Sequence, residues 1–330
     1  MQKRFFLVSV LLSLIFINCT DSVDKSQKLT LLYTTPATEW EETLPLGNGR
    51  IGMMPDGGIE SELIVLNDIT MWSGSEDEEA LNMDAIKYLP EIQELLLNGK
   101  NLEAQDLMYK HFKSGGLGSS HGNGKDAPYG CFQMLANLNI NYNYPVDVVD
   151  TEYVSDYVRE LSLNNAVAST SFNIGGVNYK REYFASHEDD VLIIYVSADK
   201  KSSVSFNLGL SRPERASFSI RDNVLYLEGQ LNDGHDGDKG VRYLTKLEII
   251  NKGGSLNSDD SSLSLSDADE AIILISTSTN MLDKVFESSV SNLHDKAKDK
   301  SFNKLKEGHI KAYKEKFDRV SLDLGNQDNV

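Results

Sequence analysis

"NAVASTSFNIGGVNYKREYFAS", residues 165–186, contains two strand-like runs separated by Gly175-Gly176. Two glycines between such runs can adopt the positive φ angles of a tight hairpin turn. The stretch therefore predicts two antiparallel strands. The pattern continues on both sides, because short apolar runs with turn signals between them fill residues 131–280.

Just upstream, "NLNINYNY", residues 137–144, has a period of two. Leu138, Ile140, Tyr142 and Tyr144 alternate with Asn137, Asn139, Asn141 and Asn143. This alternation predicts a half-buried strand with a solvated asparagine side. Many short strands with almost no intervening helix favour stacked antiparallel sheets over a parallel α/β sheet.

Helical spacing occurs in two other places. Residues 81–113 predict two short helices divided by "NGK" at 98–100. The segment 301–324 places its apolar residues on one broad face and lysines on the other, as an amphipathic helix does, and "NLHDKAKD" at 292–299 is a second candidate helix. Such a stripe needs a packing partner, either the sandwich or a missing domain.

Composition limits the function classes. With 330 residues and 40% hydrophobic content, the chain can bury a sizeable core. Its 50 acidic residues against 32 basic ones give a formal net charge of −18. Because this field repels a phosphate backbone, no nucleic-acid partner is expected.

The N-terminus has the pattern of an export signal. Lys3 and Arg4 precede an apolar run, Phe5 to Ile17, of signal-peptide length. Cys19 then stands where a bacterial lipoprotein carries its lipidated cysteine, although Asn18 replaces the usual small residue, so a plain secretory signal remains an alternative. We expect a signal peptide at 1–19, a tether at 20–28, and a periplasmic, outer-membrane or cell-surface lipoprotein whose only membrane contact is this anchor.

"LPLGNGRIGMMPDGG", residues 44–58, contains the G-x-G-x-x-G spacing of a dinucleotide-binding turn at Gly47, Gly49 and Gly52. That motif works only where a helix begins, since the helix N-terminus holds the pyrophosphate. Pro45 and Pro55 flank the glycines and prevent such a helix. The stretch is therefore interpreted as a glycine-rich turn in a β domain, and no cofactor is expected.

Two further patterns partly match known motifs, one for a nucleophilic serine and one for Ca²⁺ binding. Ser120 lies in a G-x-S-x-G pattern at 118–122, but neither a strand nor a helix flanks it as a nucleophile elbow requires. Asp233, His235, Asp236 and Asp238 could ligate Ca²⁺, yet the loop lacks the EF-hand pattern, and an acidic solvated hairpin loop is the simpler interpretation. No metal site is predicted.

The motifs "ATEWEETLPLGNGRIGMM" (37–54) and "ELIVLNDITMWSG" (62–74) resemble the opening signature of the N-terminal domain of glycoside hydrolase family 95, which includes α-L-fucosidases and α-L-galactosidases. Residues 157–199 are similar to its consecutive strands, and "HIKAYKEKFDRVSLDLG" (309–325) to its helical linker. The likeness covers about residues 29–326. It departs at 133–140, where "QMLANLNI" replaces a "PLGDL" stretch.

The resemblance implies a mainly β fold: an antiparallel β-sandwich of the super-sandwich type at 29–282, with a small helical insertion and a C-terminal helical linker at 283–330. In that family the catalytic acid and water-activating residues lie in an (α/α)₆ barrel after the linker. No catalytic residue can therefore be assigned here. We expect a truncated chain that lacks glycosidase activity alone and meets its glycan substrate only through the missing domain.

Five residues of the two motifs are candidate contacts. Trp40 and Trp72 could stack on a sugar ring, or they could be core or domain-contact residues. Asn48, Arg50 and Asn67 could hold the glycine-rich turn by hydrogen bonds, or meet the barrel.

Three functions remain under consideration. The first is the non-catalytic N-terminal domain of an exported α-L-fucosidase-like enzyme, whose parent reaction is the inverting hydrolysis of α-L-fucosides. The second is a freestanding surface lipoprotein that binds glycans. The third, an autonomous hydrolase that uses Ser120 or the acidic loop, has the least support.

Overall fold

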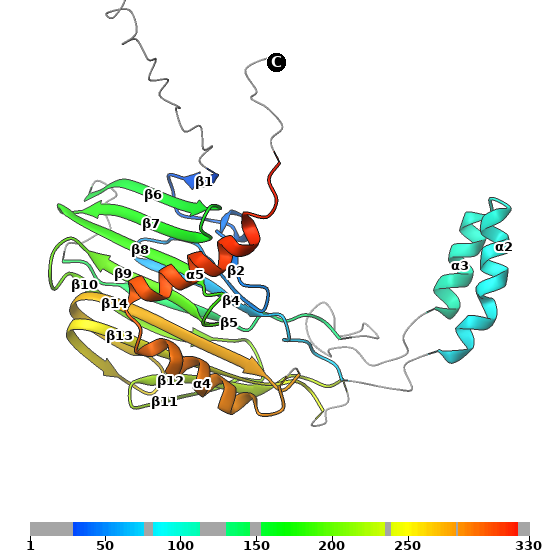
Figure 1. Cartoon of the computed structure of the whole chain (residues 1–330). Coiled ribbons are helices and arrows are strands. Elements are labelled where there is room, and N and C mark those ends of the chain that lie inside the picture. Colours follow the sequence, from blue (N-terminus) through cyan, green and yellow to red (C-terminus); the bar gives the residue numbers. More distant parts are fainter. Residues whose placement is uncertain are drawn as a thin grey trace, which may run out of the picture.

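The computed structural model describes residues 29–75, 82–112, 130–145, 153–234, 239–281 and 283–322. Most of these residues form antiparallel strands, as the alternating sequence patterns predict (Figure 1). The strands are β1 (Thr30–Tyr33), β2 (Leu46–Gly47), β3 (Ile51–Pro55), β4 (Ser61–Asp68), β5 (Ala136–Tyr142), β6 (Val154–Ser162), β7 (Val167–Ile174), β8 (Val177–Ala185), β9 (Leu192–Ala198), β10 (Val204–Ser211), β11 (Ser217–Arg221), β12 (Val224–Gln230), β13 (Arg242–Ser258) and β14 (Leu263–Thr279).

The helices are fewer and lie in two places. Between β4 and β5 the chain forms a 3₁₀ segment η3 (Met83–Tyr88) and the helices α2 (Leu89–Leu97) and α3 (Asn101–His111). After β14 come α4 (Phe286–Lys298) and α5 (Phe302–Phe317), and a short 3₁₀ turn η1 (Trp40–Glu42) precedes β2. None of the described helices is long and apolar enough to cross a membrane.

The strands form two layers joined through β14. One layer follows the order β1-β6-β7-β8-β9-β14 and continues through β13 to β12 and β11, while the other runs β2-β3-β4-β5-β10-β14 and ends on the last part of β13, Gly253–Ser258. β14 can serve both because it is 17 residues long: Leu263–Ala268 pairs with β10, and Glu270–Ile275 pairs with β9. The predicted antiparallel β-sandwich is confirmed.

One core lies between the two layers. Alternating residues of β5 (Leu138, Ile140) face residues of β9 and β14 such as Ile194 and Ile273, and all four are fully buried. The predicted alternation of β5 is therefore confirmed, with Asn139 and Asn141 exposed on the outer side. The hairpin of β7 and β8 turns at Gly175 (φ +57°) and Gly176 (φ +76°), as the two glycines predict.

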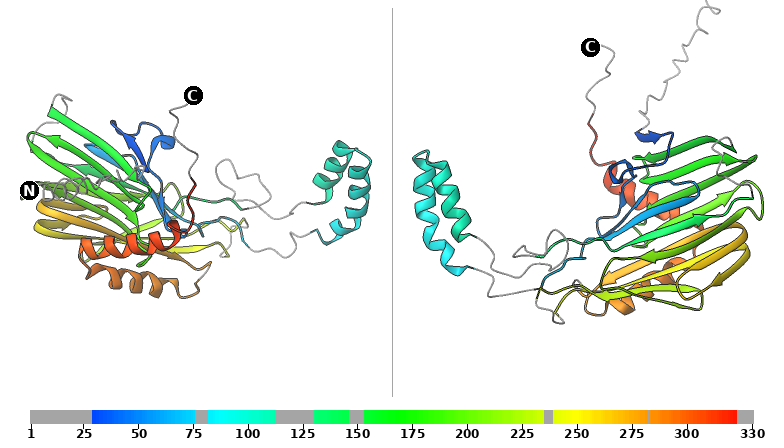
Figure 2. Two further views of the ribbon diagram at one scale, coloured as in Figure 1. Left: turned by 45° about the horizontal axis from the view of Figure 1, so that its top comes forward. Right: turned by 180° about the vertical axis from the view of Figure 1, so that it is seen from behind.

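Helices α4 and α5 cover the outer face of the first layer (Figures 1 and 2). Ala297 and Leu305 are buried against Phe184, Ile193 and Leu274. The apolar stripe of α5 therefore has a partner within the chain, namely the sandwich, as one of the two predicted alternatives requires.

The helical insertion is a hairpin. Pro90 stands in the first turn of α2, where its missing N–H has no helical partner to lose. Gly99, with φ +73°, separates the two helices where "NGK" predicted a break. Figure 1 shows α2 and α3 side by side and apart from the sandwich.

Candidate functional site

The glycine-rich stretch is a turn between two strands. Leu46 pairs with Met53, and Gly47 with Gly52. A Cβ on Gly52 would lie 2.8 Å from the carbonyl oxygen of Leu46, and Gly49 has φ +97°, so both positions need glycine. Gly52, the third glycine, lies in the strand β3 and does not open a helix, so the stretch lacks the helix N-terminus that a pyrophosphate needs.

Asn48 ties this turn to the β8–β9 connection. Its Nδ2 donates to the carbonyl oxygen of Ser186 (2.9 Å) and to Oδ1 of Asp190 (2.7 Å). Its Oδ1 accepts from the backbone N–H groups of Arg50 and Ile51. One amide side chain therefore fixes its own turn and joins it to residues about 140 positions away.

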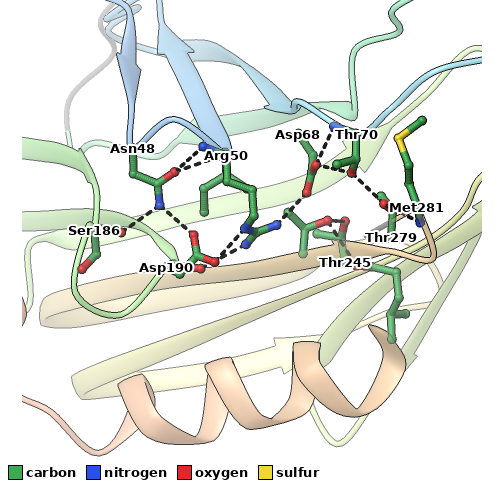
Figure 3. Close-up of polar contacts among 12 residues, drawn as sticks. Asn48, Arg50, Asp68, Thr70, Ser186, Asp190, Thr245, Thr279 and Met281 are labelled. Carbon is green, nitrogen blue, oxygen red and sulfur yellow. Dashed lines mark hydrogen bonds and ion pairs between the residues drawn. The ribbon is translucent and has the colours of Figure 1, made fainter. Parts of the chain in front are cut away.

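Arg50 lies between two carboxylates (Figure 3). Its Nε donates to Oδ2 of Asp190 (2.6 Å), and Nη1 donates to Oδ2 of Asp68 (2.7 Å). The side chain of Asp68 is fully buried, whereas those of Arg50 and Asp190 are 23% and 34% exposed. The partly exposed guanidinium therefore joins the end of β4 to the β8–β9 turn.

Asp68 extends the network to β14. Its Oδ1 accepts from the N–H and the hydroxyl of Thr70, and this hydroxyl lies 2.6 Å from Oγ1 of Thr279. Thr279 Oγ1 also accepts from the N–H of Met281. We call Asn48, Arg50, Asp68, Thr70, Ser186, Asp190 and Thr279 the end clamp.

Sequence reasoning found only part of this clamp. Asn48 and Arg50 belong to it, but Asn67 sits opposite Gly52 in the β3–β4 ladder and forms no side-chain hydrogen bond with any described residue. The next residue, Asp68, was missed, as was Asp190. The only available signal was the presence of acidic residues in "HEDD" (187–190) and "LND" (66–68). Nothing in a single sequence shows that Arg50 joins Asp190 and Asp68.

The two tryptophans lie apart from each other and outside the core. Trp40 is 57% exposed and precedes Leu44, whose N–H bonds Pro55 at one end of β3. Trp72 is 42% exposed and follows Asp68, which pairs with Ile51 at the other end. The alternative that they are core residues is wrong, because Trp40 lies in η1 and Trp72 in an isolated bridge to Phe132, both outside the long strands and exposed.

Trp72 belongs to an exposed apolar group beside the end clamp. Its ring meets that of Phe132 edge-on with centroids 5.9 Å apart, and its Nε1 donates to the carbonyl oxygen of Ile69. Ile69, Phe132 and Met281 are each about half exposed. We call Ile69, Trp72, Phe132 and Met281 the apolar rim.

A second arginine network lies deep in the sandwich. Arg181 and Glu62 are 1% and 0% exposed and form an ion pair of 3.2 Å. Glu62 also accepts from the hydroxyls of Tyr142 (2.8 Å) and Tyr183 (2.6 Å). Burial raises the pKa of Glu62 against the opposing charge of Arg181. No solvent reaches this pair, so its role is structural.

Other buried acids hold the C-terminal helices in place. Glu182 bonds Lys306 of α5 (2.7 Å), and Asp189 bonds Lys300 at the α4–α5 junction. Burial alone would raise the pKa of Glu182, but hydrogen bonds from Lys306 and Lys180 outweigh this effect and lower the pKa. These contacts attach the linker helices to β8 and to the turn after it.

The acidic loop at 233–238, considered as a Ca²⁺ site and interpreted as a solvated hairpin loop, is only partly described. Asp233 is buried and its Oδ2 accepts from the N–H of Lys239, so it is not the solvated loop residue expected. His235, Asp236 and Asp238 lie outside the described residues. In the part of the chain that the structure describes, no three His, Cys, Asp or Glu residues group as a metal site.

Other predicted features also lie outside the described residues. These are the signal peptide at 1–19 with Cys19, the tether at 20–28, and Ser120. They remain sequence-based predictions.

Comparisons with known proteins agree on the kind of domain. Residues 31–284 match the family model described as "Glycosyl hydrolase family 65, N-terminal domain". The chain is 29% identical to "Alpha-L-fucosidase 2" of Arabidopsis thaliana, over 92% of this chain and 38% of that protein.

Two fungal proteins called "Probable alpha-fucosidase A" are also similar. The one from Aspergillus niger is 25% identical over 85% of this chain and 35% of its own length. The one from Aspergillus oryzae is 28% identical over 49% of this chain and 21% of its own length. The chain thus matches well under half the length of each of these relatives.

Proposed function

The chain belongs to the family of glycosyl hydrolase family 65 N-terminal domains, and from that premise we propose that it is the non-catalytic N-terminal β-sandwich of an exported α-L-fucosidase-like glycoside hydrolase. The α-fucosidase relatives and the two opening motifs support the finer placement in glycoside hydrolase family 95. The parent reaction that we propose is the inverting hydrolysis of α-L-fucosides in fucosylated glycans.

The observation that carries the proposal is the state of the buried acids. Glycoside hydrolysis needs two carboxyl groups that face a shared substrate cleft. Among the described residues, Glu62, Asp68, Glu182 and Asp189 are instead each held by a cation of the protein, and Asp233 by a backbone N–H. Carboxylates fixed in this way hold the fold together, which supports a non-catalytic role for the domain.

The end clamp gives the domain a structural role. It fixes the β2–β3 turn, the β8–β9 turn and the end of β14 to one another, and the apolar rim lies on its exposed side. Apolar side chains grouped at a surface are typical of contact sites. We propose that this end is where the sandwich meets the rest of the enzyme, with Trp72 as its central contact.

The domain limits and location belong to the same proposal. We assign the sandwich to residues 29–282 and the helical linker to 283–330, with α4 and α5 packed on the first layer. For the location we propose export and a lipid anchor at Cys19, supported by the apolar run of residues 5–17.

The test of the non-catalytic proposal is an assay on an aryl α-L-fucoside. We expect the purified chain to release no more chromophore than buffer alone, while a complete α-L-fucosidase under the same conditions hydrolyses the substrate. Hydrolysis that co-purifies with the folded chain would overturn the proposal. Sequencing the gene beyond codon 330 tests its second half, because we expect a sequence that encodes an (α/α)₆ barrel, and an unrelated gene there would contradict it.

A further inference from the structure

Apart from Asp267 of β14, the exposed residues of five adjoining strand segments on the outer face of the second layer carry no charge. The paired registers place Asn141 opposite Asn207, Asn207 opposite Ser264, and Ser264 opposite Asn257. The outward residues of these segments are Ser61 and Leu63 of β4, Asn139 and Asn141 of β5, Asn207 and Gly209 of β10, Ser264 and Ser266 of β14, and Ser255 and Asn257 of β13.

Such a face is unusual for this chain. A quarter of its residues are charged. Here asparagine, serine and glycine take their place. Uncharged hydrogen-bonding side chains on a rigid sheet suit a ligand that is itself polar and uncharged.

A hollow of about 460 Å³ lies on this face. It is lined by Asn139 and Asn141, by residues 207–210 of β10, and by Asp259, Ser262 and Ser264. Its size falls within the roughly 300–1,000 Å³ of small-molecule sites. Gly209 keeps it open beside the 259–262 turn, since a Cβ there would lie 3.2 Å from the carbonyl oxygen of Ser261.

The polar groups of the hollow are free to bind. The side chains of Asn141 and Asn207 form no hydrogen bond with any residue that the structure describes, and each offers two donors and an acceptor. Asn139 uses one donor on Oγ of Ser211 (3.0 Å). The hollow therefore presents several unused donors and acceptors side by side, which matches neighbouring hydroxyl groups of a ligand.

The charge at the hollow excludes anionic ligands. Its lining contains no lysine or arginine, and its single ionisable group is Asp259. Backbone N–H groups of Ser261 and Ser262 and the hydroxyl of Ser262 lower the pKa of Asp259 to about 2, so this carboxylate stays ionised and holds the turn. A phosphate, sulfate or uronate would be repelled.

We propose that this hollow binds a neutral, hydroxyl-rich ligand, namely a segment of an uncharged oligosaccharide or polysaccharide. The site lies on the sandwich itself and goes beyond the proposed non-catalytic role, since it gives the domain a ligand of its own.

The test is native gel electrophoresis of the full chain with soluble polysaccharide in the gel. Galactomannan and xyloglucan are the neutral probes, and polygalacturonate is the anionic one. We expect at least one neutral probe to retard the chain in a saturable way, and polygalacturonate to leave its mobility unchanged.

A double variant locates the binding. Asn141→Ala with Asn207→Ala removes the free amides and should weaken the apparent affinity about tenfold or more, since two lost hydrogen bonds give roughly that change. The matched control is Asn143→Ala, which lies on the same side of the same stretch outside the hollow and should change affinity by less than about twofold. Thermal melting shows whether each variant is folded.

Three results would overturn the proposal. They are no retardation by either neutral probe, unchanged retardation of the folded double variant, or an equal loss in Asn143→Ala. None of them bears on the fucoside assay, so the failure of this site and the failure of the proposed non-catalytic role are distinguishable.

Discussion

The buried pair of Arg181 and Glu62 and the end clamp around Arg50 use the same chemistry in two settings. In both, a guanidinium binds a carboxylate that is fully buried, Glu62 for Arg181 and Asp68 for Arg50. They differ in the arginine, because Arg181 has no contact with solvent whereas Arg50 keeps about a quarter of its side chain exposed.

This difference decides how much each network depends on its partners. Arg181 compensates its burial with carbonyl oxygens of Gly58 and Ile59, the hydroxyl of Tyr144, and the ring of Tyr142 at 3.4 Å. A buried charge is tolerated only when it is paired and hydrogen-bonded, and the loss of one partner leaves the other uncompensated. At the end clamp, water can replace part of a lost contact.

The largest effect is expected from Arg181→Met. It leaves the carboxylate of Glu62 buried without its cation, so the free energy of unfolding should fall by about 3–5 kcal/mol. Urea unfolding followed by circular dichroism measures the change.

The matched control is the double variant Arg181→Met with Glu62→Leu. Because it removes both charges, it should recover part of the loss. If the double variant is less stable than Arg181→Met alone, the uncompensated charge of Glu62 is not what destabilises Arg181→Met. The comparison between the two networks then fails.

Arg50→Met should have a smaller effect, about 2 kcal/mol, because Arg50 and Asp190 are partly exposed and water can take over part of the lost contact. The same unfolding experiment measures it. A loss as large as that of Arg181→Met would show that solvent access does not soften the end clamp.

Asn48→Ala should cost about 1–2 kcal/mol, since it removes neutral and charge-assisted hydrogen bonds around one turn. Hydrogen exchange of the amides of Arg50 and Ile51 should accelerate, because Asn48 Oδ1 is their acceptor. Unchanged exchange at these two amides would contradict the assigned role of Asn48.

The two settings should also differ in their response to pH. Burial raises the folded-state pKa of Glu62 above 4.5, so the native state binds more protons than the unfolded chain above pH 4.5. This contribution lowers stability as pH rises from about 4.5 through the folded pKa. Glu62→Gln should remove this pH dependence. The measurement is the difference in the free energy of unfolding between the variant and the wild type across pH 4–8.

His309 acts in the opposite direction within the same range. Burial lowers its folded-state pKa below 6.5, so its contribution favours folding above pH 6.5 and is lost as pH falls. The Glu62 slope must therefore be taken from the difference between the two proteins. Identical pH profiles would rule out a raised pKa at Glu62.

The smallest effect is expected at the surface. Lys252 and Glu270 form an exposed ion pair of 3.4 Å, so Lys252→Ala should change the free energy of unfolding by less than about 0.5 kcal/mol. The same urea titration checks it. A larger loss would mean that exposed ion pairs also stabilise this sandwich. Burial alone would then not determine how much each ion pair contributes to the free energy of unfolding.

Local patterns predicted much of the fold. The period of two in residues 137–144, the two glycines of the β7–β8 turn and the stripe of α5 each depend on neighbours within one element, and all three appear in the structure. The pairing of β14 with both β9 and β10 could not be predicted, since it joins segments through contacts about 60–80 residues apart.

The candidate site shows the same limit. The turn signature around Asn48 and Arg50 was visible as a motif, but their partners Asp68 and Asp190 are ordinary acids among 50. Burial of Trp40 and Trp72 was one expectation for large aromatic residues, and both proved exposed because they lie outside the long strands. Long-range contacts and exposure follow from the assembled fold.

The double pairing of β14 also constrains how the chain acquires its structure during synthesis. β14 ends at Thr279 and is the last strand, yet it joins the two layers. Until it leaves the ribosome, the strands already made can form three separate part-sheets, which end in unpaired edges at β9, β10 and β13 and have exposed apolar faces. Exposed edges and apolar faces of this kind are what chaperones bind and what promotes aggregation. We therefore expect nascent chains that stop before β14 to depend on chaperones, and the sandwich to close only once β14 has left the ribosome.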